Sequence, residues 1–432
     1  MKKIRIGIFG AGRGYNLSKN FMMMPDCEIV ALCDNHKQRR EAALEKLGGD
    51  VASYENFDDF IQHDMDAVIV ANNFHEHTPF VIKCFERGLH VFCECLSNVT
   101  MAEGVELVRA FEKSSSIYMI AENYPDMIFN REMKRVVDSG KLGKILFAEG
   151  EYNHPVGGND IAFMKEYIYY PEHWRNFLPR SYYQTHSLGP VMRITGATPV
   201  RVTAFAAYAP NRGDFPSATM VGDGATIVMT QNDDGSVFRV IGNSKFGAHE
   251  NSYRVCGTEG QMENVRGMGN KVMLRYNAWS TPEGEQTESL YEPSWNDPEE
   301  KFIRRGGHGG GDYITCRTFA ESVRAGVQPP HPYDLHSAVT MSSVAILAHR
   351  SVLEGGKPYD IPDFHTEEAR VQYENDRLTP FWMDGNPPTL PCCSHPDHRP
   401  TERQLELFRE LVMDEPAKKY VLSTRWSRGC RC

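Results

Sequence analysis

The sequence predicts an α/β protein in which a doubly wound parallel sheet is followed by an α+β domain with an open, mainly antiparallel sheet. Three observations predict this order. A chain of 432 residues is too long for one ordinary core. Short apolar strands alternate with helical segments over residues 1–124, and turn signals such as Asp234–Gly235 separate β-rich runs farther along. We therefore expect one domain at 1–124, a second at 125–360 and a C-terminal extension at 361–432.

Strands and helices alternate regularly through the first segment. Apolar runs predict strands at 4–10, 27–34, 66–71, 89–94 and 117–123. Helices are expected after the glycine turn that follows the first strand and at 37–49, 77–88 and 100–114. Thr78 is a candidate N-cap and Gly88 a terminator, while Thr100 and Glu103 have capping-box spacing.

The later segments have a different pattern. The second begins with a helix at 127–143 and a strand at 145–154, and β-rich runs follow at 199–209, 225–242 and 252–265. A long helix rich in small residues is expected from 335 and ends at Gly355–Gly356. The extension contains one amphipathic stretch at 403–412.

Composition and charge exclude several classes of function. The net charge of −10 argues against a nucleic-acid or anionic-membrane partner, and no apolar run is long enough to span a bilayer. The apolar stretch at the N-terminus alternates like a strand and runs into a glycine loop, so a signal peptide is not expected. Cysteines inside apolar strands, such as Cys27 and Cys33, indicate reduced thiols and a cytoplasmic protein.

A glycine loop predicts a dinucleotide site. In "FGAGRGYN", Gly10, Gly12 and Gly14 follow the first strand and open the first helix, where backbone can approach a pyrophosphate. The third glycine stands one place early relative to G-x-G-x-x-G. Asp34 ends the next strand, where a carboxylate accepts hydrogen bonds from a ribose 2′-hydroxyl and repels a 2′-phosphate. This context favours NAD over NADP and over the alternative of a solvated acidic residue.

The stretch "GLHVFCECLSNVT" places Cys93 and Cys95 on either side of Glu94. A reactive pair, a metal site and a core strand ending at a cofactor are three interpretations, and the strand carries no further metal ligand at a recognised spacing. We interpret Cys93 as core packing and Cys95 as lining the cofactor. A second group fits no recognised zinc finger, so no metal is expected: Cys392, Cys393, His395, His398, Cys430 and Cys432.

Two loops carry candidate catalytic side chains. "SYYQTHSLGP" presents Tyr183 and His186, a phenol and an imidazole suited to proton transfer. The alternative is a buried aromatic beside a satisfied core histidine. "GGHGGGD", with His308 and Asp312, is a glycine-dense loop where backbone can approach a ligand, or else a mobile surface loop.

Together these motifs resemble the glucose–fructose oxidoreductase/inositol dehydrogenase family (Gfo/Idh/MocA) over residues 1 to about 360. That family joins an N-terminal NAD-binding Rossmann domain to an α/β domain with an open sheet. Its G-K-H-V-x-x-E-K-P segment is similar to "GLHVFCECLSN", so Glu94 matches the family glutamate. Cys95 stands where the catalytic lysine of the dehydrogenases would be, and Leu96 replaces the proline.

A narrower branch, the NAD-dependent glycosidases typified by α-N-acetylgalactosaminidases, is similar in several further motifs. "GAGRGY" resembles its G-x-G-x-R-G-Y loop, "HEHTPF" its H-T-P segment and "IAENY" its M-E-N segment. "YYQTHSLGPV" and "GGHGGGDY" resemble its Y-P-T-H-G-L-G-P-V and H-G-G-M-D-F segments. The resemblance implies cofactor contacts from Arg13, His77, Glu94, Cys95 and Asn123, and catalytic roles for Tyr183, His186, His308 and Asp312.

The resemblance also implies a reaction. A glycoside would be oxidised transiently at carbon 3, lose its anomeric substituent by elimination, add water and be reduced again by the same cofactor. Tyr183 and His186 would transfer protons, while His308 and Asp312 would hold sugar hydroxyls. The alternatives are an NAD-dependent sugar or cyclitol dehydrogenase and a non-catalytic NAD-binding sensor. A dimer or tetramer is expected by analogy, and the extension would cover the sugar site, extend an interface or do neither.

Overall fold

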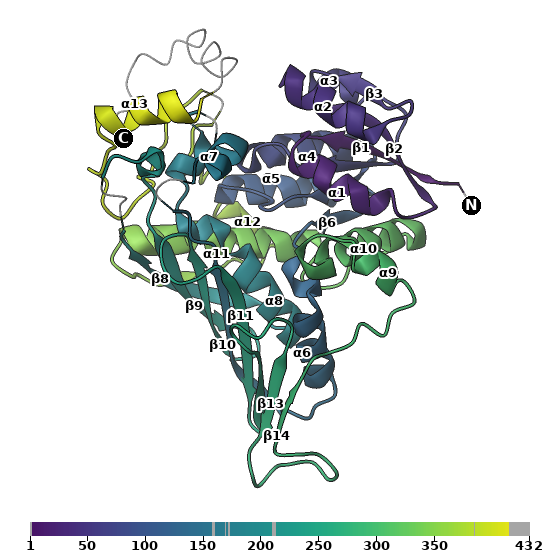
Figure 1. Cartoon of the computed structure of the whole chain (residues 1–432), viewed down its shortest axis with the longest axis vertical. Helices are drawn as coiled ribbons and strands as arrows, with labels where there is room; N and C mark the ends of the chain where they lie inside the picture. Colours follow the sequence, from purple (N-terminus) through teal and green to yellow (C-terminus); the bar gives the residue numbers. More distant parts are fainter. Residues whose placement is uncertain are drawn as a thin grey trace.

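The computed structural model describes residues 2–157, 160–168, 170–171, 173–209, 213–383 and 385–413. Two sheets organise it, a six-stranded parallel sheet and a nine-stranded mainly antiparallel one (Figure 1). The expected fold class is confirmed. No helix in these ranges is long and apolar enough to cross a membrane.

The first sheet has the strand order β3-β2-β1-β4-β5-β6, and all its pairings are parallel. Its strands are β1 (Ile4–Phe9), β2 (Cys27–Cys33), β3 (Ala52–Tyr54), β4 (Ala67–Val70), β5 (His90–Cys93) and β6 (Tyr118–Ile120). The chain winds outward in both directions from the β1–β4 pair. The carboxyl ends of these two strands therefore frame the crevice in which open α/β sheets bind ligands.

The helices of this domain are α1 (Arg13–Phe21), α2 (Lys37–Leu47), α3 (Phe57–Phe60), α4 (His77–Glu86) and α5 (Met101–Phe111). The predicted capping box is confirmed, because Thr100 and Glu103 bond reciprocally at the start of α5. The predicted N-cap at Thr78 is wrong. A short 3-10 turn, η1 (Phe74–Glu76), runs directly into α4, so Thr78 lies in the first turn and donates its hydroxyl to the Ser97 carbonyl at 3.0 Å.

The second sheet has the order β14-β13-β12-β11-β7-β10-β9-β8-β15. Only β7 and β10 pair in parallel, and the Asp234–Gly235 turn joins β9 to β10 as predicted. The strands are β7 (Ile145–Asn153), β8 (Pro199–Ala207), β9 (Ala225–Asn232), β10 (Val237–Asn243), β11 (Glu250–Gly257), β12 (Gly260–Asn264), β13 (Val272–Tyr276), β14 (Glu288–Tyr291) and β15 (Tyr359–Asp360).

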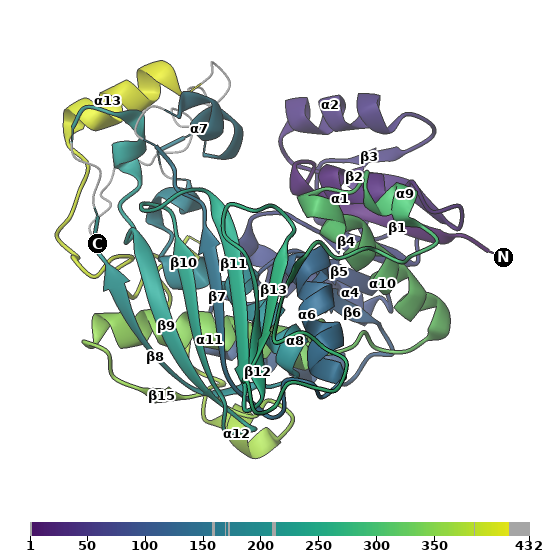
Figure 2. The same cartoon turned by 60° about the horizontal axis from the view of Figure 1, so that its bottom comes forward.

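Helices cover one face of this sheet, and Figure 2 shows the other face turned outward. The covering helices are α6 (Ile128–Asp138), α8 (Thr185–Thr195) and α11 (Leu335–Leu353). On the outer face Glu149 forms ion pairs with Arg239 at 2.6 Å and Arg254 at 2.5 Å. The sheet therefore has one apolar face and one charged face.

Helix α10 (Gly311–Ala325) packs on the first domain although it follows the second sheet in the chain. Phe319 lies 5.1 Å from Phe92 and 6.1 Å from Phe21, measured between ring centroids. Because these rings are buried, α10 completes the core of the N-terminal domain. This packing holds the first turn of α10, with Asp312, beside the glycine loop.

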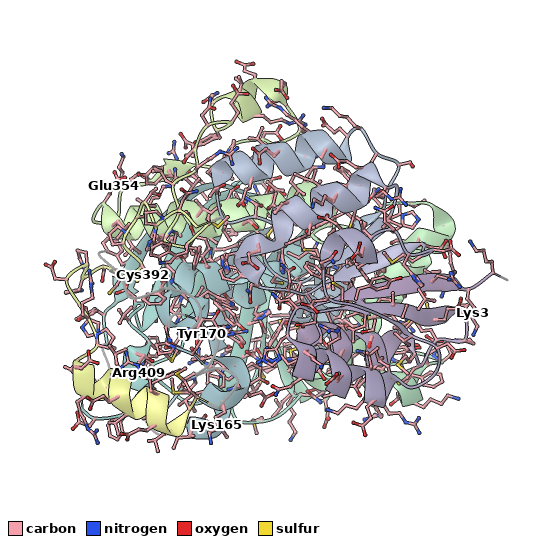
Figure 3. All side chains as sticks on the ribbon, turned by 90° about the horizontal axis from the view of Figure 1, so that it is seen from above. Lys3, Lys165, Tyr170, Glu354, Cys392 and Arg409 are labelled. Carbon is pink, nitrogen blue, oxygen red and sulfur yellow. The ribbon has the colours of Figure 1, made fainter. Side chains whose placement is uncertain are left out.

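The extension folds back on the second domain. Helix α13 (Glu402–Leu411) buries Phe408 with Met164 of α7 (Ile161–Tyr167) and with Met220. Figure 3 shows α13, with Arg409, beside Lys165 at one corner of the molecule and Lys3 at the opposite edge. The remaining elements are α9 (Glu300–Ile303), α12 (Glu367–Val371), η2 (Tyr124–Asp126), η3 (Trp174–Phe177), η4 (Arg180–Tyr183), η5 (Pro216–Thr219) and η6 (His308–Gly310).

Candidate active site

The glycine loop between β1 and α1 has the form that a dinucleotide requires. Gly10 has φ of +100°, and a Cβ there would stand 2.3 Å from the Ala71 carbonyl oxygen. A Cβ at Gly14 would stand 2.7 Å from Ile8, so this glycine lets α1 lie close against β1 even though it is one place early. A Cβ at Gly12 would meet nothing within 4 Å. The loop is therefore open at Gly12, where a pyrophosphate would lie.

Two polar residues flank this loop and fit the rest of a dinucleotide. Asp34 accepts hydrogen bonds from the backbone nitrogens of Ala11 and His36, each at 2.7 Å, and so its carboxylate faces the loop. Asn72 is the second residue after β4, and neither polar atom of its buried side-chain amide has a hydrogen-bond partner within the described ranges. A buried amide without a protein partner beside the loop is suited to hydrogen-bonding a polar ligand, so the residues present fit NAD.

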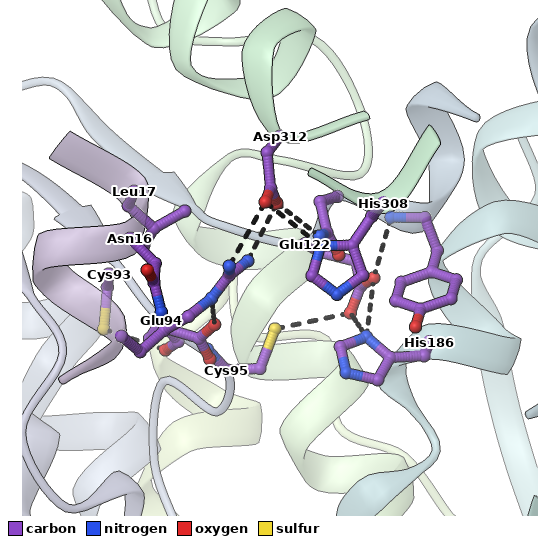
Figure 4. A network of polar contacts seen from close by, with 12 residues as sticks. Asn16, Leu17, Cys93, Glu94, Cys95, Glu122, His186, His308 and Asp312 are labelled. Carbon is purple, nitrogen blue, oxygen red and sulfur yellow. Dashed lines mark hydrogen bonds and ion pairs between the residues drawn. The ribbon is translucent and has the colours of Figure 1, made fainter. Parts of the chain in front are cut away.

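Arg13, the first residue of α1, connects the two domains. Its guanidinium donates to Glu94 at 3.0 Å and to both carboxylate oxygens of Asp312, at 2.8 and 3.2 Å (Figure 4). Burial alone would raise the pKa of Asp312, but the hydrogen bond from His308 and the charge of Arg13 hold it well below its usual range. Asp312 is therefore a carboxylate whose charge is already compensated.

Asn123 and His308 complete the network around Asp312. The Asn123 amide donates to Asp312 at 2.5 Å, and Nδ1 of His308 lies 3.0 Å from the other carboxylate oxygen. The His308 side chain is 39% exposed, whereas that of Asp312 is 4% exposed. In this arrangement Asp312 orients His308, and His308 presents its other ring nitrogen to a ligand. A direct contact of Asp312 with a sugar hydroxyl stays a prediction.

His186 is held by a carboxylate that the sequence analysis did not single out. Its Nδ1 lies 2.9 Å from both oxygens of Glu122, whose side chain is completely buried. Burial alone would raise the pKa of Glu122, but His186, Thr185 and the backbone nitrogen of Tyr124 together keep it below its ordinary value. The pair is an ionised carboxylate behind an imidazole whose Nε2 is left for a ligand.

Cys95 reaches the same carboxylate from the first domain. Its Sγ lies 3.3 Å from Glu122, and burial followed by the charge of Glu122 raises the pKa of this thiol well above its ordinary value. Cys93 ends β5 and is fully buried, with its Sγ 3.6 Å from Nδ1 of His77. Because the strand stops at Cys93, the two sulfurs have different surroundings, and both are free thiols.

His77 is enclosed beneath the loop that follows β5. Its Nδ1 lies 2.7 Å from the Leu96 carbonyl oxygen and its Nε2 3.4 Å from that of Asn72. Burial lowers the pKa of His77, so the ring is neutral, and its single N–H donates to the nearer of the two carbonyl oxygens, that of Leu96. A direct contact with the dinucleotide stays a prediction.

Aromatic rings surround His186. The ring centroids of Tyr124, Tyr152 and Tyr183 lie 4.4, 4.8 and 5.4 Å from that of His186. The His308 ring lies 5.6 Å from Tyr124 on the other side. The structure thus brings the predicted Tyr183, His186 and His308 together. Flat rings with polar tips are suited to binding the apolar faces and hydroxyls of a sugar.

Comparisons with known families agree with this geometry. Residues 4–122 match a family model described as "Oxidoreductase family, NAD-binding Rossmann fold". Residues 131–370, more than half of the chain, match one described as "Glycosyl hydrolase 109, C-terminal domain". The chain belongs to the glycosyl hydrolase 109 family. The resemblance found in the sequence and the expectation of NAD as cofactor are both confirmed.

Curated relatives of the glycosyl hydrolase 109 family cover most of the chain. A "Glycosyl hydrolase family 109 protein" of Saccharopolyspora erythraea is 28% identical over 393 residues, covering 84% of this chain and 83% of the relative. An α-N-acetylgalactosaminidase of Shewanella oneidensis is 23% identical over 407 residues, covering 84% of this chain and 85% of the relative.

Solved structures share the fold. Levoglucosan dehydrogenase in complex with NADH and levoglucosan aligns with a TM-score of 0.70 and 16% identity, over 84% of this chain and 100% of that chain. The myo-inositol 2-dehydrogenase of Lactobacillus plantarum aligns with a TM-score of 0.64 and 21% identity, over 83% of this chain and 100% of that chain. At this identity the likeness establishes architecture.

Within this glycosyl hydrolase 109 chain, the sequence analysis missed four site residues. They are Asn72, Glu122, Tyr124 and Tyr152. Each is a polar or amphipathic residue that stands just beyond the end of a strand or in the last part of one. Their position could have identified them from the sequence, because residues at the carboxyl ends of strands in open α/β sheets commonly contact ligands.

The cysteines and histidines of the extension lie apart from this site. Asp223, Cys393 and His395 have ligand atoms within 4.8 Å of one another, and no other group of metal-capable residues occurs in the described part of the chain. Both oxygens of Asp223 already accept hydrogen bonds from Ser394. Cys430 and Cys432 lie outside the described residues.

Proposed function

We propose that this chain is an NAD-dependent glycosidase that works by transient oxidation of its sugar. The observation that carries the proposal is the Glu122–His186 pair, with the thiol of Cys95 where a sugar dehydrogenase of this fold would have a lysine. An acid-backed imidazole is suited to removing a proton from carbon. The names of the curated relatives, which are glycosidases, support the same conclusion.

The cofactor would be held by the glycine loop, Asp34 and Asn72. NAD, when bound, supplies an acceptor that takes a hydride from a sugar carbon and later returns it. Arg13 pairs with both Glu94 and Asp312 beside the loop, so its charge offsets part of the repulsion that these two carboxylates would exert on the dinucleotide phosphates.

His186 would remove the proton from carbon 2 of the sugar through Nε2. That proton becomes acidic while carbon 3 is a ketone, and Glu122 stabilises the imidazolium that forms. Tyr183 would then transfer a proton to or from the anomeric oxygen, while His308, oriented by Asp312, would bind a sugar hydroxyl. The three side chains come from different elements, so substrate enclosed by them would be oriented as well as activated.

Cys95 argues against an ordinary dehydrogenase. A lysine ammonium has three donors and a positive charge with which to stabilise the alkoxide that forms as the substrate hydroxyl loses its proton, whereas a thiol is one weak donor. Because the pKa of Cys95 is raised, its sulfur stays protonated and donates to Glu122. We therefore assign proton transfer to His186 and not to residue 95, where the dehydrogenases have their lysine.

The test is turnover of a panel of aryl glycosides in heavy water with NAD-loaded enzyme. We expect release of aglycone, deuterium at carbon 2 of the freed sugar and no accumulation of NADH. NADH formed in stoichiometric amounts with a keto-sugar would instead establish the dehydrogenase. NAD binding with no turnover on any glycoside would establish the sensor. Tyr183→Phe should abolish turnover, and Tyr373→Phe in the extension is the matched control.

Location and assembly are part of the same proposal. The described cysteines are free and mostly buried, which supports a reducing compartment such as the cytoplasm. On the uncovered face of the second sheet, Met229 is 37% exposed and lies opposite Arg239 of β10, and we infer that copies associate through this face. Light scattering measures the mass of the assembly in solution. We expect the wild type to be an oligomer and a Met229→Lys variant to be a monomer.

A further inference from the structure

Two cations without partners lie beside the aromatic cluster. Arg180 is the first residue of η4, which ends at Tyr183, and Lys245 follows β10 closely. A Cβ at Gly242 would stand 2.6 Å from the Arg180 carbonyl oxygen, so η4 lies directly against β10. A Cβ at Gly224 would stand 2.8 Å from Lys245 Cγ, so this glycine leaves room for the lysine side chain.

Neither cation meets an acceptor. Nε of Arg180 and Nζ of Lys245 are buried and have no hydrogen-bond partner among the described residues. Other arginines with an unpaired Nε, such as Arg239 and Arg350, bind carboxylates through their remaining nitrogens. Arg180 has no such ion pair in the ranges described. The pair therefore differs from the structural ion pairs elsewhere in the chain.

Arg180 and Lys245 are each destabilised in their charged form, because both are buried and both lie near another cation. Burial and the charge of Arg180 lower the pKa of Lys245 to about 8, and burial, together with the charge of Arg175, lowers the pKa of Arg180 to about 10. Two like charges removed from water without an acceptor are strongly unfavourable. Proteins keep such an arrangement where an anion completes it.

The pair lies within electrostatic reach of the proposed sugar site. Tyr183 and Tyr152 are the groups whose charge would favour protonated Arg180. Burial lowers the pKa of His154 to about 4, with smaller contributions from His249, His186 and Arg180, so that ring is neutral and adds no charge of its own. Arg180 and Tyr183 are the first and last residues of η4, so an anionic group at Arg180 lies one 3-10 turn from the aromatic cluster.

We propose that Arg180 and Lys245 bind an anionic substituent of the substrate, so that the enzyme acts on acidic glycosides bearing a carboxylate or a sulfate ester. This inference rests on the proposed function, because it names the substrate class of that site. A guanidinium and an ammonium both form charge-assisted hydrogen bonds with carboxylate and sulfate oxygens. Neutral sugar hydroxyls offer no charge with which to compensate the pair.

The test is calorimetric binding of monosaccharides to the full NAD-loaded chain, which requires no turnover. Glucuronate, glucose 6-sulfate and glucose form a matched set in which two members carry an anion. We expect at least one of the acidic sugars to bind on the order of ten-fold or more tightly than glucose, the size of a charge-assisted contact. The stronger of the two identifies carboxylate or sulfate as the group recognised.

Variants make the outcome specific. Lys245→Met and Arg180→Gln should each bring the affinity ratio between acidic and neutral sugar close to one, and Lys113→Met, at an exposed lysine of the first domain, should keep the full ratio. Equal binding of all three sugars to the wild type, or an unchanged ratio in both variants, would overturn the inference. Selective binding of an acidic sugar without hydrolysis of any glycoside would uphold the anion site formed by Arg180 and Lys245 but reject the glycosidase, and with it acidic glycosides as substrates. Hydrolysis of neutral glycosides alone would uphold the glycosidase and overturn the anion site.

Discussion

Nδ1 of His186 lies 2.9 Å from each carboxylate oxygen of Glu122, and the Glu122 side chain is completely buried. The carboxylate comes from the segment after β6 and the imidazole from the first turn of α8, so the pair joins the two domains. A buried carboxylate in this position selects the tautomer that leaves Nε2 free and stabilises the ring when it accepts a proton.

Replacing Glu122 by Gln should lower kcat by about 100-fold or more, because general-base catalysis by His186 would lose its electrostatic support. Gln keeps the size of the side chain and one acceptor, so substrate binding and KM should change much less than kcat. Steady-state hydrolysis of an aryl glycoside measures both constants. NAD affinity, measured by calorimetry, should stay near the wild-type value.

The control for this change is Glu45→Gln, at an exposed position of α2. It should leave kcat as in the wild type. If Glu122→Gln instead retained full kcat, general-base catalysis by a carboxylate-supported His186 would be rejected. Tyr183 would then be the remaining candidate for the base.

Asp34→Asn should weaken NAD binding on the order of ten-fold and reduce the discrimination against NADP. The carboxylate accepts from Ala11 and His36 at 2.7 Å, and a ribose hydroxyl at the loop would add a further charge-assisted bond. Titration with each dinucleotide measures the two affinities. Asp50→Asn, in the exposed turn after α2, is the comparison. Unaltered affinity for both cofactors would place the ribose elsewhere.

Asp312→Asn should destabilise the fold by about 2 kcal/mol, because Arg13 would lose its closest carboxylate while half enclosed between the domains. Glu94 remains as a partner, which limits the loss. Urea unfolding at neutral pH measures the change, and Asp397→Asn at an exposed site of the extension should show none. A loss of activity without any loss of stability would mean that the carboxylate acts on substrate alone.

The same residue predicts a pH dependence. The pKa of Asp312 is lowered in the folded state, so the unfolded chain takes up a proton at higher pH than the folded chain does. Its contribution to stability is therefore complete above the ordinary carboxyl range and declines as pH falls below about 4. The difference in unfolding free energy between wild type and Asp312→Asn should shrink as the solution is acidified through that range.

Local patterns made the cofactor site predictable. Gly10, Gly12 and Gly14 lie within one turn, and Asp34 ends the next strand, so sequence spacing alone locates them together. The fold classes of both sheets followed from strand–helix alternation and from turn signals. The return of α10 to the first domain could not be foreseen, because the contact of Phe319 with Phe92 depends on the route of the intervening chain.

Most of the site contacts that could not be predicted from the sequence are ion pairs and hydrogen bonds between residues that are far apart in the chain. The ion pair of Arg13 with Asp312 joins residues that are 299 positions apart, and Glu122 reaches His186 across a domain boundary. Asn123 was identified through its motif, yet its neighbour Glu122 makes the stronger contact with the proposed base. Both members of this polar doublet are buried, and which partner each of them meets depends on chain segments that lie far away in the sequence.

Lys245→Met should stabilise the unliganded protein by on the order of 1–3 kcal/mol at neutral pH, since it removes a buried charge that has no partner. The groups that face Lys245 are Arg180 from η4 and His398 from the extension, and neither is an acid. With its pKa lowered to about 8, wild-type Lys245 sheds its proton before the unfolded chain does, so wild-type stability should rise between pH 8 and the ordinary lysine range. The variant should lack this rise in urea unfolding. A variant that is less stable than wild type at pH 7 would mean that the ammonium has a structural partner, and Lys113→Met calibrates the effect of losing an exposed lysine.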